Sequence, residues 1–117
     1  MKLLNTEFYE IKKSKFISYY YEVHSLEEVT SIIDTLKKEH KKAKHIPYAY
    51  KINQYMKKSD DKEPSGTSGM PILNIILKND LNYVLIAVVR YFGGIKLGAG
   101  GLARAYGTAA KKAIQID

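Results

Sequence analysis

The sequence contains no cysteine and no long run of apolar residues. Without cysteine, the chain has no disulfide bond, no thiolate chemistry and no cysteine-ligated zinc. No apolar stretch approaches the roughly 18–20 residues that cross a bilayer. The N-terminal MKLLNTEFYE places acidic and polar residues where a signal peptide needs an apolar core. We therefore expect a cytoplasmic protein with no membrane partner.

The composition is that of an ordinary globular protein, with 117 residues of which 45% are hydrophobic and 26% charged. This length fits one domain with one core, spanning residues 1–117. The net charge of +7 favours polyanionic partners, either nucleic acid or an acidic protein surface. Solvated faces in a lysine-rich protein explain the charge equally well. The lysines occur in short runs: Lys12, Lys13 and Lys15; Lys37, Lys38, Lys41, Lys42 and Lys44; Lys57 and Lys58; Lys111 and Lys112.

The residue pattern predicts the element order β-β-α-β-loop-α-β-α. Aromatic and β-branched residues favour strands, and a Ser25-x-x-Glu28 capping box precedes an amphipathic stripe that favours a helix. The order implies a two-layer α/β domain with a mixed sheet, helices on one face and an open face opposite. The expected elements are strands at 7–23 with a turn at 12–15, a helix at 26–41, a strand at 45–56, a loop at 57–69, a helix or strand at 71–78, a central strand at 83–92 and a helix at 101–116.

Five glycines lie between the expected central strand and the last helix, in the run YFGGIKLGAGGLARAY at 91–106. Glycine allows positive φ and close approach, and the backbone N–H groups of a turn before a helix can bind an anion. Arg90, Lys96 and Arg104 flank the turn and supply positive charge. A tight turn with close helix packing explains the glycines equally well.

The glycine-rich run does not fully match the known nucleotide-binding motifs. The P-loop pattern fails because Ala99 follows Gly98. Residues 98–103 fit G-x-G-x-x-A, but too few residues follow Ala103 for the second strand and ribose-binding acid of a dinucleotide fold. We expect no cofactor and no bound metal, since the acidic groups at 60–63 suit ion pairs with Arg90 or Lys96 better than a Mg²⁺ site.

Two long motifs resemble those of the Impact, or YigZ-like, family. One is VVRYFGGIKLGAGGLARAYG at 88–107, and the other is SDDKEPSGTSGMP at 59–71, with Lys62 where the family usually has glycine. Two weaker blocks are KFI at 15–17 and His45-x-x-Tyr-Ala-Tyr50. In the second of these, Pro47 replaces a common cysteine. Together they span about residues 6 to 115.

The resemblance implies the fold of the second domain of ribosomal protein S-five, β-β-β-α-β-α in two layers with a left-handed crossover. It also implies a role near RNA or the ribosome for bacterial members. Eukaryotic relatives restrain an amino-acid-starvation kinase pathway through an added N-terminal domain. Bacterial members usually carry a second, ferredoxin-like domain, which we expect to be missing from a chain ending at Asp117.

The leading hypothesis is a binding module in translation regulation, with RNA or a ribosome-associated protein as partner and a phosphate-like anion as a further ligand. Tyr19, Tyr20 and Tyr21 together with Tyr48, Tyr50 and Tyr55 could form an aromatic platform for bases, although half-buried strand packing explains each tyrosine equally well. The predicted anion or nucleic-acid contacts are Arg90, Gly93, Gly94, Lys96, Gly98, Gly100, Gly101 and Arg104.

Two alternatives come from other classes. The first is an enzyme acting on a phosphorylated or peptide substrate, with no assigned catalytic residue and His45 as the histidine best suited to be a base; it requires the two motifs to meet in one cleft. The second is a protein-interaction domain without a small ligand, indicated by an exposed apolar patch on the sheet. The second motif comprises Ser59, Asp60, Asp61, Glu63, Pro64, Ser65, Gly66 and Thr67.

Overall fold

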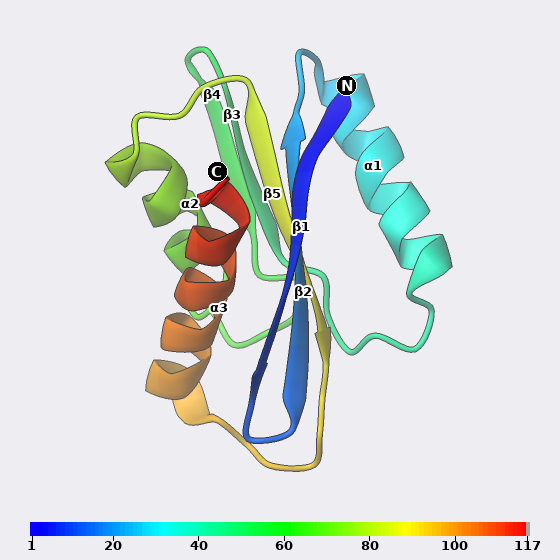
Figure 1. Cartoon of the computed structure of the whole chain (residues 1–117), viewed down its shortest axis with the longest axis vertical. Coiled ribbons are helices and arrows are strands. Elements are labelled where there is room, and N and C mark those ends of the chain that lie inside the picture. The colour runs from blue at the N-terminus through cyan, green and yellow to red at the C-terminus, as the bar shows by residue number, and fades with distance from the viewer. Residues whose placement is uncertain (117) are drawn as a thin grey trace.

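A computed structural model describes residues 1–116 of the chain. It contains five strands and three helices in the order β-β-α-β-β-α-β-α, with α/β as its class as predicted (Figure 1). The elements are β1 (Lys2–Ile11), β2 (Ser14–Glu22), α1 (Leu26–Glu39), β3 (Tyr48–Ile52), β4 (Tyr55–Ser59), α2 (Gly69–Lys78), β5 (Val84–Tyr91) and α3 (Gly98–Ile114).

The five strands form one sheet in the order β1-β2-β5-β3-β4. The predicted central strand is confirmed, because β5 lies in the middle and is buried from Val84 to Arg90. Every neighbouring pair is antiparallel, so the predicted mixed sheet is wrong. Two of the pairs are hairpins, and β5 runs opposite to both of its neighbours.

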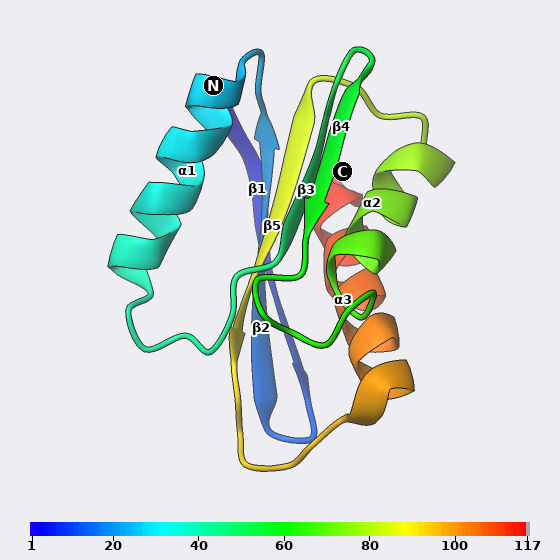
Figure 2. The same ribbon diagram turned by 180° about the vertical axis from the view of Figure 1, so that it is seen from behind.

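Helices cover both faces of the sheet, which makes three layers (Figures 1 and 2). Val84, Ile86 and Val88 pack in a cluster with residues of α2 and α3, whereas the alternate residues of β5 pack with α1. The predicted two-layer arrangement, with helices on one face and an open face opposite, is therefore wrong. The reason lies in β5 itself: a strand that is apolar on both faces must be covered on both faces.

Two tight turns organise the hairpins. Lys12 and Lys13 have φ of 47° and 66°, which places the first turn inside the predicted 12–15 segment. Asn53 has φ of 57° and begins a second turn that divides the expected 45–56 strand into β3 and β4. Since β4 continues to Ser59, the first three residues of the predicted 57–69 loop are in fact strand. The extra strand, and α1 after the second strand, also depart from the β-β-β-α-β-α order that the family resemblance implied.

The helices begin close to their predicted positions. Ser25 accepts a hydrogen bond from the Glu28 N–H at 3.2 Å, while the Glu28 carboxylate accepts one from the His24 N–H at 2.9 Å, one residue before the expected partner. The 71–78 segment is part of α2, so its strand alternative is excluded. The last helix begins at Gly98 rather than 101, so three of the five clustered glycines lie in its first turn.

The loop 92–97 and the β1–β2 turn lie at one end of the molecule, and the start of β1 and the end of α3 lie toward the other (Figure 1). At the first end, Gly93 packs directly on the hairpin turn, and a Cβ there would lie 2.0 Å from the carbonyl oxygen of Lys13. Among residues 1–116, no helix has the length and apolar character of a membrane span.

Substitution by alanine should change the free energy of unfolding in opposite directions at Gly93 and at Gly107. Gly93→Ala should lower the free energy of unfolding by about 3 kcal/mol, because the Lys13 backbone must move to admit the methyl group. Gly107→Ala should raise it by about 1 kcal/mol, because its nearest neighbour, Pro71, would lie 4.0 Å away and alanine favours a helix interior. Urea unfolding followed by circular dichroism measures both. Equal effects of the two substitutions would contradict the assignment of Gly93 to a close backbone contact.

Candidate functional site

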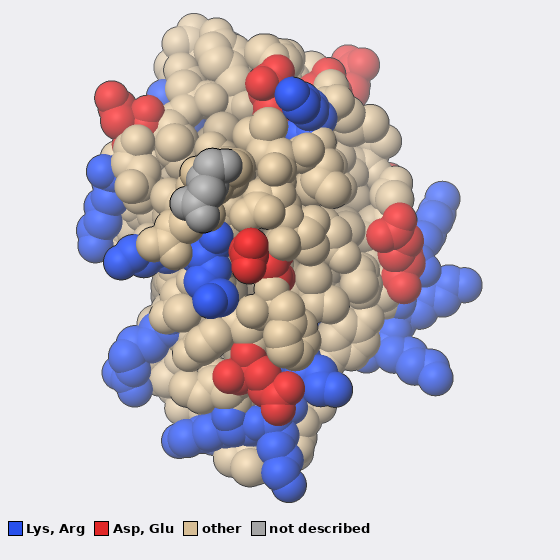
Figure 3. Space-filling view, in the orientation of Figure 1, with Lys and Arg blue, Asp and Glu red and all other residues tan. Residues whose placement is uncertain are grey.

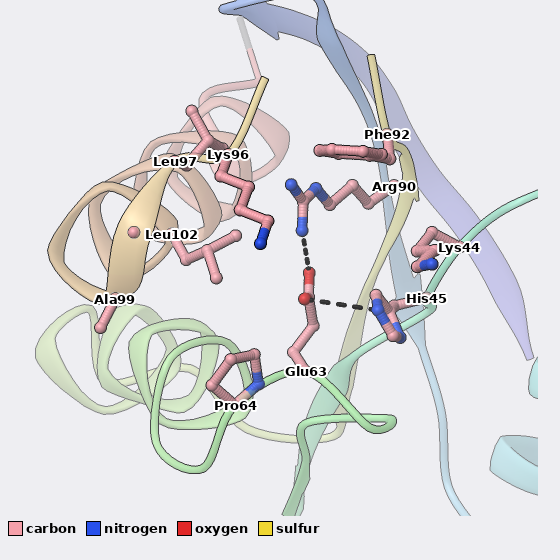
Figure 4. Close-up of a pocket in the computed structure, with 11 residues that line it drawn as sticks. Lys44, His45, Glu63, Pro64, Arg90, Phe92, Lys96, Leu97, Ala99 and Leu102 are labelled. Atoms are coloured by element: carbon pink, nitrogen blue, oxygen red, sulfur yellow. Dashed lines mark hydrogen bonds and ion pairs between the residues drawn. The ribbon is translucent and has the colours of Figure 1, made fainter. Parts of the chain in front are cut away.

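The two sequence motifs meet at a pocket of about 390 Å³ between the 60–64 loop, the end of β5 and the start of α3 (Figure 4). Its walls combine apolar and cationic side chains, and its floor is an acidic and basic pair. The lining residues are Lys44, His45, Glu63, Pro64, Arg90, Phe92, Lys96, Leu97, Gly98, Ala99 and Leu102. Residues separated by nearly 60 positions in the chain therefore share one cavity.

A buried ion pair forms the floor of the pocket. Arg90 Nη1 donates to Glu63 Oε2 at 2.7 Å, and the two residues are only 5% and 6% exposed. Arg90 continues the side of β5 that faces α2 and α3. Its guanidinium lies 5.8 Å from the ring centre of Phe16 and 5.5 Å from that of Phe92. Glu63 therefore neutralises the charge of Arg90, which is one of the two cations that the acidic groups at 60–63 were expected to pair with.

Glu63 also accepts a hydrogen bond from the hydroxyl of Tyr106 on α3. Burial raises the pKa of Tyr106, and the hydrogen bond to the Glu63 carboxylate raises it further. The phenol therefore stays a neutral donor. One carboxylate thus joins the 60–69 loop to both β5 and α3.

His45 lies against the same carboxylate from the segment before β3. Its Nδ1 is 2.7 Å from the carbonyl oxygen of Asp61, which can only accept, so Nδ1 carries the proton. Its Nε2 is directed at Glu63 Oε1, at 3.4 Å. The backbone of the same segment pairs with β5, because Arg90 N–H donates to the His45 carbonyl at 2.9 Å. His45 and Lys44 are thereby held at the rim of the pocket.

Asp60 organises the loop behind the pocket. Its carboxylate accepts hydrogen bonds from the N–H groups of Gly66, Ser68 and Gly69 at 3.0, 3.1 and 2.8 Å, and from the Ser68 hydroxyl at 2.9 Å. Burial favours its neutral form, but these four donors outweigh that effect and hold the pKa of Asp60 below its usual range. Since two of the N–H groups open α2, Asp60 caps that helix from a distance in the sequence.

Most of the other polar groups of the second motif are also engaged. Asp61 accepts from the Ile46 N–H at 2.7 Å, and Ser59 Oγ accepts from the Asp61 N–H at 3.2 Å. The Thr67 hydroxyl donates to the Pro64 carbonyl at 2.6 Å. Within residues 1–116, no group of three or more acidic or histidine side chains is arranged to hold a metal ion. Pro64 lines the pocket, while Ser65 and Gly66 are exposed in the loop.

The turn at Asp61 and Lys62 shows why glycine is expected at position 62. Asp61 and Lys62 both have positive φ, at 45° and 69°. Glycine adopts this conformation without strain, which accounts for its usual place at position 62 in the family. The turn is kept here by a lysine.

The predicted anion contacts divide into separate places. Lys96 and Gly98 line the pocket together with Arg90, whereas Gly101 and Arg104 line a second groove between β1 and α3. Three glycines line neither cavity: Gly93 packs on the hairpin turn, Gly94 takes φ of 92° in the loop, and Gly100 lies within the first turn of α3. Their predicted role in anion binding stays a prediction.

The expected tyrosine platform is not formed. Tyr20 and Tyr50 are buried, and Tyr19, Tyr21 and Tyr48 pack against the cluster under α1. Only Tyr55 of the six, at the start of the edge strand β4, is largely exposed. The exposed aromatic beside the cationic groups is Phe92, at 43% exposure, which the sequence analysis did not select. Its signal was present, since a phenylalanine directly after a central strand and before two glycines has no core position to fill.

Comparison with known proteins identifies the family. The model of the Impact N-terminal domain matches residues 12–114. The chain is 47% identical over 100 residues to the IMPACT family member YvyE of Bacillus subtilis, covering 83% of this chain and 46% of that protein. It is 36% identical over 111 residues to the IMPACT family member YigZ of Escherichia coli, covering 91% and 54%. The chain therefore belongs to the Impact family and spans about half the length of these curated relatives.

Solved structures agree with this assignment. A crystal structure described as that of a hypothetical protein superposes with a TM-score of 0.90 at 35% identity, covering 95% of this chain and 56% of that one. The two-domain translational regulator Yih1 superposes with a TM-score of 0.62 at 26% identity, covering 97% and 45%. The α/β fold with its five-stranded sheet is thus one that Impact-family proteins share.

The Asp60 contacts predict a pH-dependent loss of stability. Asp60→Asn should lower the free energy of unfolding by about 1–3 kcal/mol at pH 7, because an amide accepts fewer of the four bonds. A depressed folded-state pKa stabilises the fold above the unfolded value of about 3.9 and ceases to do so as pH falls through the folded value. The difference between the two proteins should therefore stay constant from pH 6 to about 5 and shrink as the pH falls below about 3.9. Asp34→Asn, on an exposed position of α1, is the matched control and should show no such trend.

The Glu63 contacts predict strong coupling between two residues. Glu63→Met should lower the free energy of unfolding by about 3–5 kcal/mol, because it leaves the Arg90 charge buried without a partner. Adding Arg90→Met should recover part of this loss, since no buried charge then remains. Urea unfolding of the two single variants and the double variant measures the coupling. Additive losses would show that the pair does not act as a unit.

Proposed function

We propose that this chain binds RNA through the end of the molecule that carries the β1–β2 turn and the loop 92–97, and that it acts in translation control. The observation that carries the proposal is a band of cationic side chains around the start of α3. Lys44 and Lys96 line the pocket on one side of Leu97, and Lys12 and Arg104 line the groove on its other side. Lys and Arg side chains project at this end in Figure 3.

Lys12, Lys44, Lys96 and Arg104, which make up this band, form no ion pair with an acidic residue among residues 1–116. The ion pairs among residues 1–116 involve Glu22, Glu28 and Glu63, and none of them contains a lysine or Arg104. Lysines that have no partner inside the protein can neutralise the phosphates of a polyanion, which releases the cations condensed on the polyanion and so favours binding. The relative Yih1 is described as a translational regulator. We extend that role to this chain and assign RNA as the polyanion.

An enzyme acting on a phosphorylated substrate is the second candidate. It is favoured by one observation, that the two motifs share the pocket with His45 and Glu63. The hydroxyls of Ser59 and Thr67 are engaged in loop hydrogen bonds, and the exposed Ser65 does not line the pocket, so water would be the nucleophile. Release of inorganic phosphate from phosphorylated peptides and RNA 5′ ends, compared between the protein and its His45→Ala variant, tests this candidate. A protein-interaction domain without a small ligand stays the third alternative, and the large apolar side chains exposed on the sheet lie on its edge strands: Leu3 and Phe8 on β1, Tyr55 and Met56 on β4.

The proposal predicts salt-dependent binding to single-stranded RNA. Fluorescence anisotropy with a labelled oligonucleotide of about 12 nucleotides should give a logarithm of the association constant that falls linearly with the logarithm of salt concentration. Lys12→Gln and Lys96→Gln should each make this slope shallower by about 0.7, because each removes one phosphate contact. Lys38→Gln on α1 changes the net charge equally and should leave the slope unchanged. Absence of binding at low salt, or an affinity insensitive to salt, would contradict the proposal.

A further inference from the structure

We propose that the 390 Å³ pocket receives one unstacked nucleotide of a single-stranded RNA, with the base against Phe92 and the phosphate near Lys96 and the first turn of α3. This inference rests on the proposed function and deepens it. It assigns the recognition of a single nucleotide to a site that is separate from the general attraction of the cationic band.

Phe92 supplies the aromatic surface. Its ring is 43% exposed and lies over the Arg90 guanidinium, which Glu63 holds in place. The ring is therefore supported from one side and open elsewhere, at the edge of a pocket with the apolar side chains of Pro64, Leu97 and Leu102 (Figure 4). Single-stranded RNA is recognised mostly by bases that leave the stack and pack against such rings.

The helix α3 and a buried donor supply polar contacts for the ligand. No side chain caps the N-terminus of α3, so its first N–H groups are free to meet an anion beside Lys96. The Nε of Arg90, in a side chain that is 6% exposed, has no hydrogen-bond partner among residues 1–116. In Figure 4 the guanidinium projects toward the centre of the lining residues. A buried donor without a partner is costly, and an acceptor on the ligand would satisfy it.

The size and surroundings of the pocket select the ligand. About 390 Å³ is at the lower end of the range for small-molecule sites, which suits one nucleotide and is too small for a double helix. Leu97 separates the pocket from the groove that Lys12 and Arg104 line. A strand that leaves the pocket past Leu97 therefore meets further cations at once, which favours an RNA chain over a free anion.

The sequence offers a direct reporter, because it contains no tryptophan. In Phe92→Trp the single indole should be quenched when a single-stranded RNA of about 12 nucleotides is added. Phe8→Trp is the matched control: Phe8 is 53% exposed on β1 and lines no part of the pocket, so its quenching should be much smaller.

Affinity provides the second measurement. Phe92→Leu should weaken binding about 5- to 150-fold, the effect of losing one stacked base, and should leave the salt slope unchanged because no ionic contact is lost. Phe8→Leu should leave affinity unchanged. Circular dichroism melting of each variant identifies losses that come from unfolding. The same RNA annealed as a duplex should bind at least about tenfold more weakly than the single strand.

The possible outcomes separate this inference from the function on which it rests. If Phe92→Leu binds as the unchanged protein does while Lys12→Gln and Lys96→Gln weaken binding, the pocket takes no base, and only the cationic band is confirmed. Equal affinity for duplex and single strand also overturns the inference. If a mononucleotide quenches Phe92→Trp at the same concentration as the oligonucleotide, the ligand is a free nucleotide and the assignment to RNA is wrong. If no RNA binds at low salt, both proposals fall.

Discussion

The buried ion pair between Arg90 and Glu63 determines how the rest of the site is arranged. A guanidinium at the end of a buried strand cannot keep its water, so it requires a carboxylate in contact. The carboxylate comes from a loop that would otherwise have no reason to approach β5. The same group holds Tyr106, so that α3 is fixed in position along with the loop. One pair of charges thus fixes the 60–69 loop against β5 and α3.

A division of roles follows from this arrangement. Arg90 and Glu63 neutralise one another inside the protein, and the Asp60 carboxylate accepts its hydrogen bonds from the loop and the start of α2. The cluster of charged residues that resembles an active site therefore consists of residues that support the walls of the pocket. Recognition of an external charge passes to exposed groups at the rim, Lys44 and Lys96, and to the backbone N–H groups of α3. Rim groups of this kind can be exchanged without loss of the fold.

Much of the fold and part of the site could be predicted from the sequence. The capping box, the central strand and the turn at the first hairpin depend on local contacts, and local patterns identified them. The division of 45–56 into two strands was missed because Asn53 makes its turn without a glycine beside it. The third layer was missed for a different reason. The pattern of β5 required cover on two faces, but the element order alone did not show to which face each helix returns.

The pairing of residues across the site was harder to foresee. An ion pair between the 60–63 acids and Arg90 was among the expectations, but Asp60, Asp61 and Glu63 have three different sets of partners that spacing does not reveal. The place of Phe92 directly after the central strand was a signal in the sequence, but its exposure and its contact with Arg90 are properties of the folded chain. Gly107 shows the converse: a glycine inside a helix would be taken as a sign of a close contact, yet a Cβ there would meet only Pro71, at 4.0 Å.

The placement of the chain ends has a practical consequence for handling the molecule. The start of β1 and the end of α3 lie away from the loop 92–97 and the pocket (Figure 1). An affinity tag, a fluorophore or a surface linker joined at either end would therefore leave the pocket facing solution. Immobilised protein would present the same face in every copy, so surface-based measurements on this domain should not suffer from a blocked site.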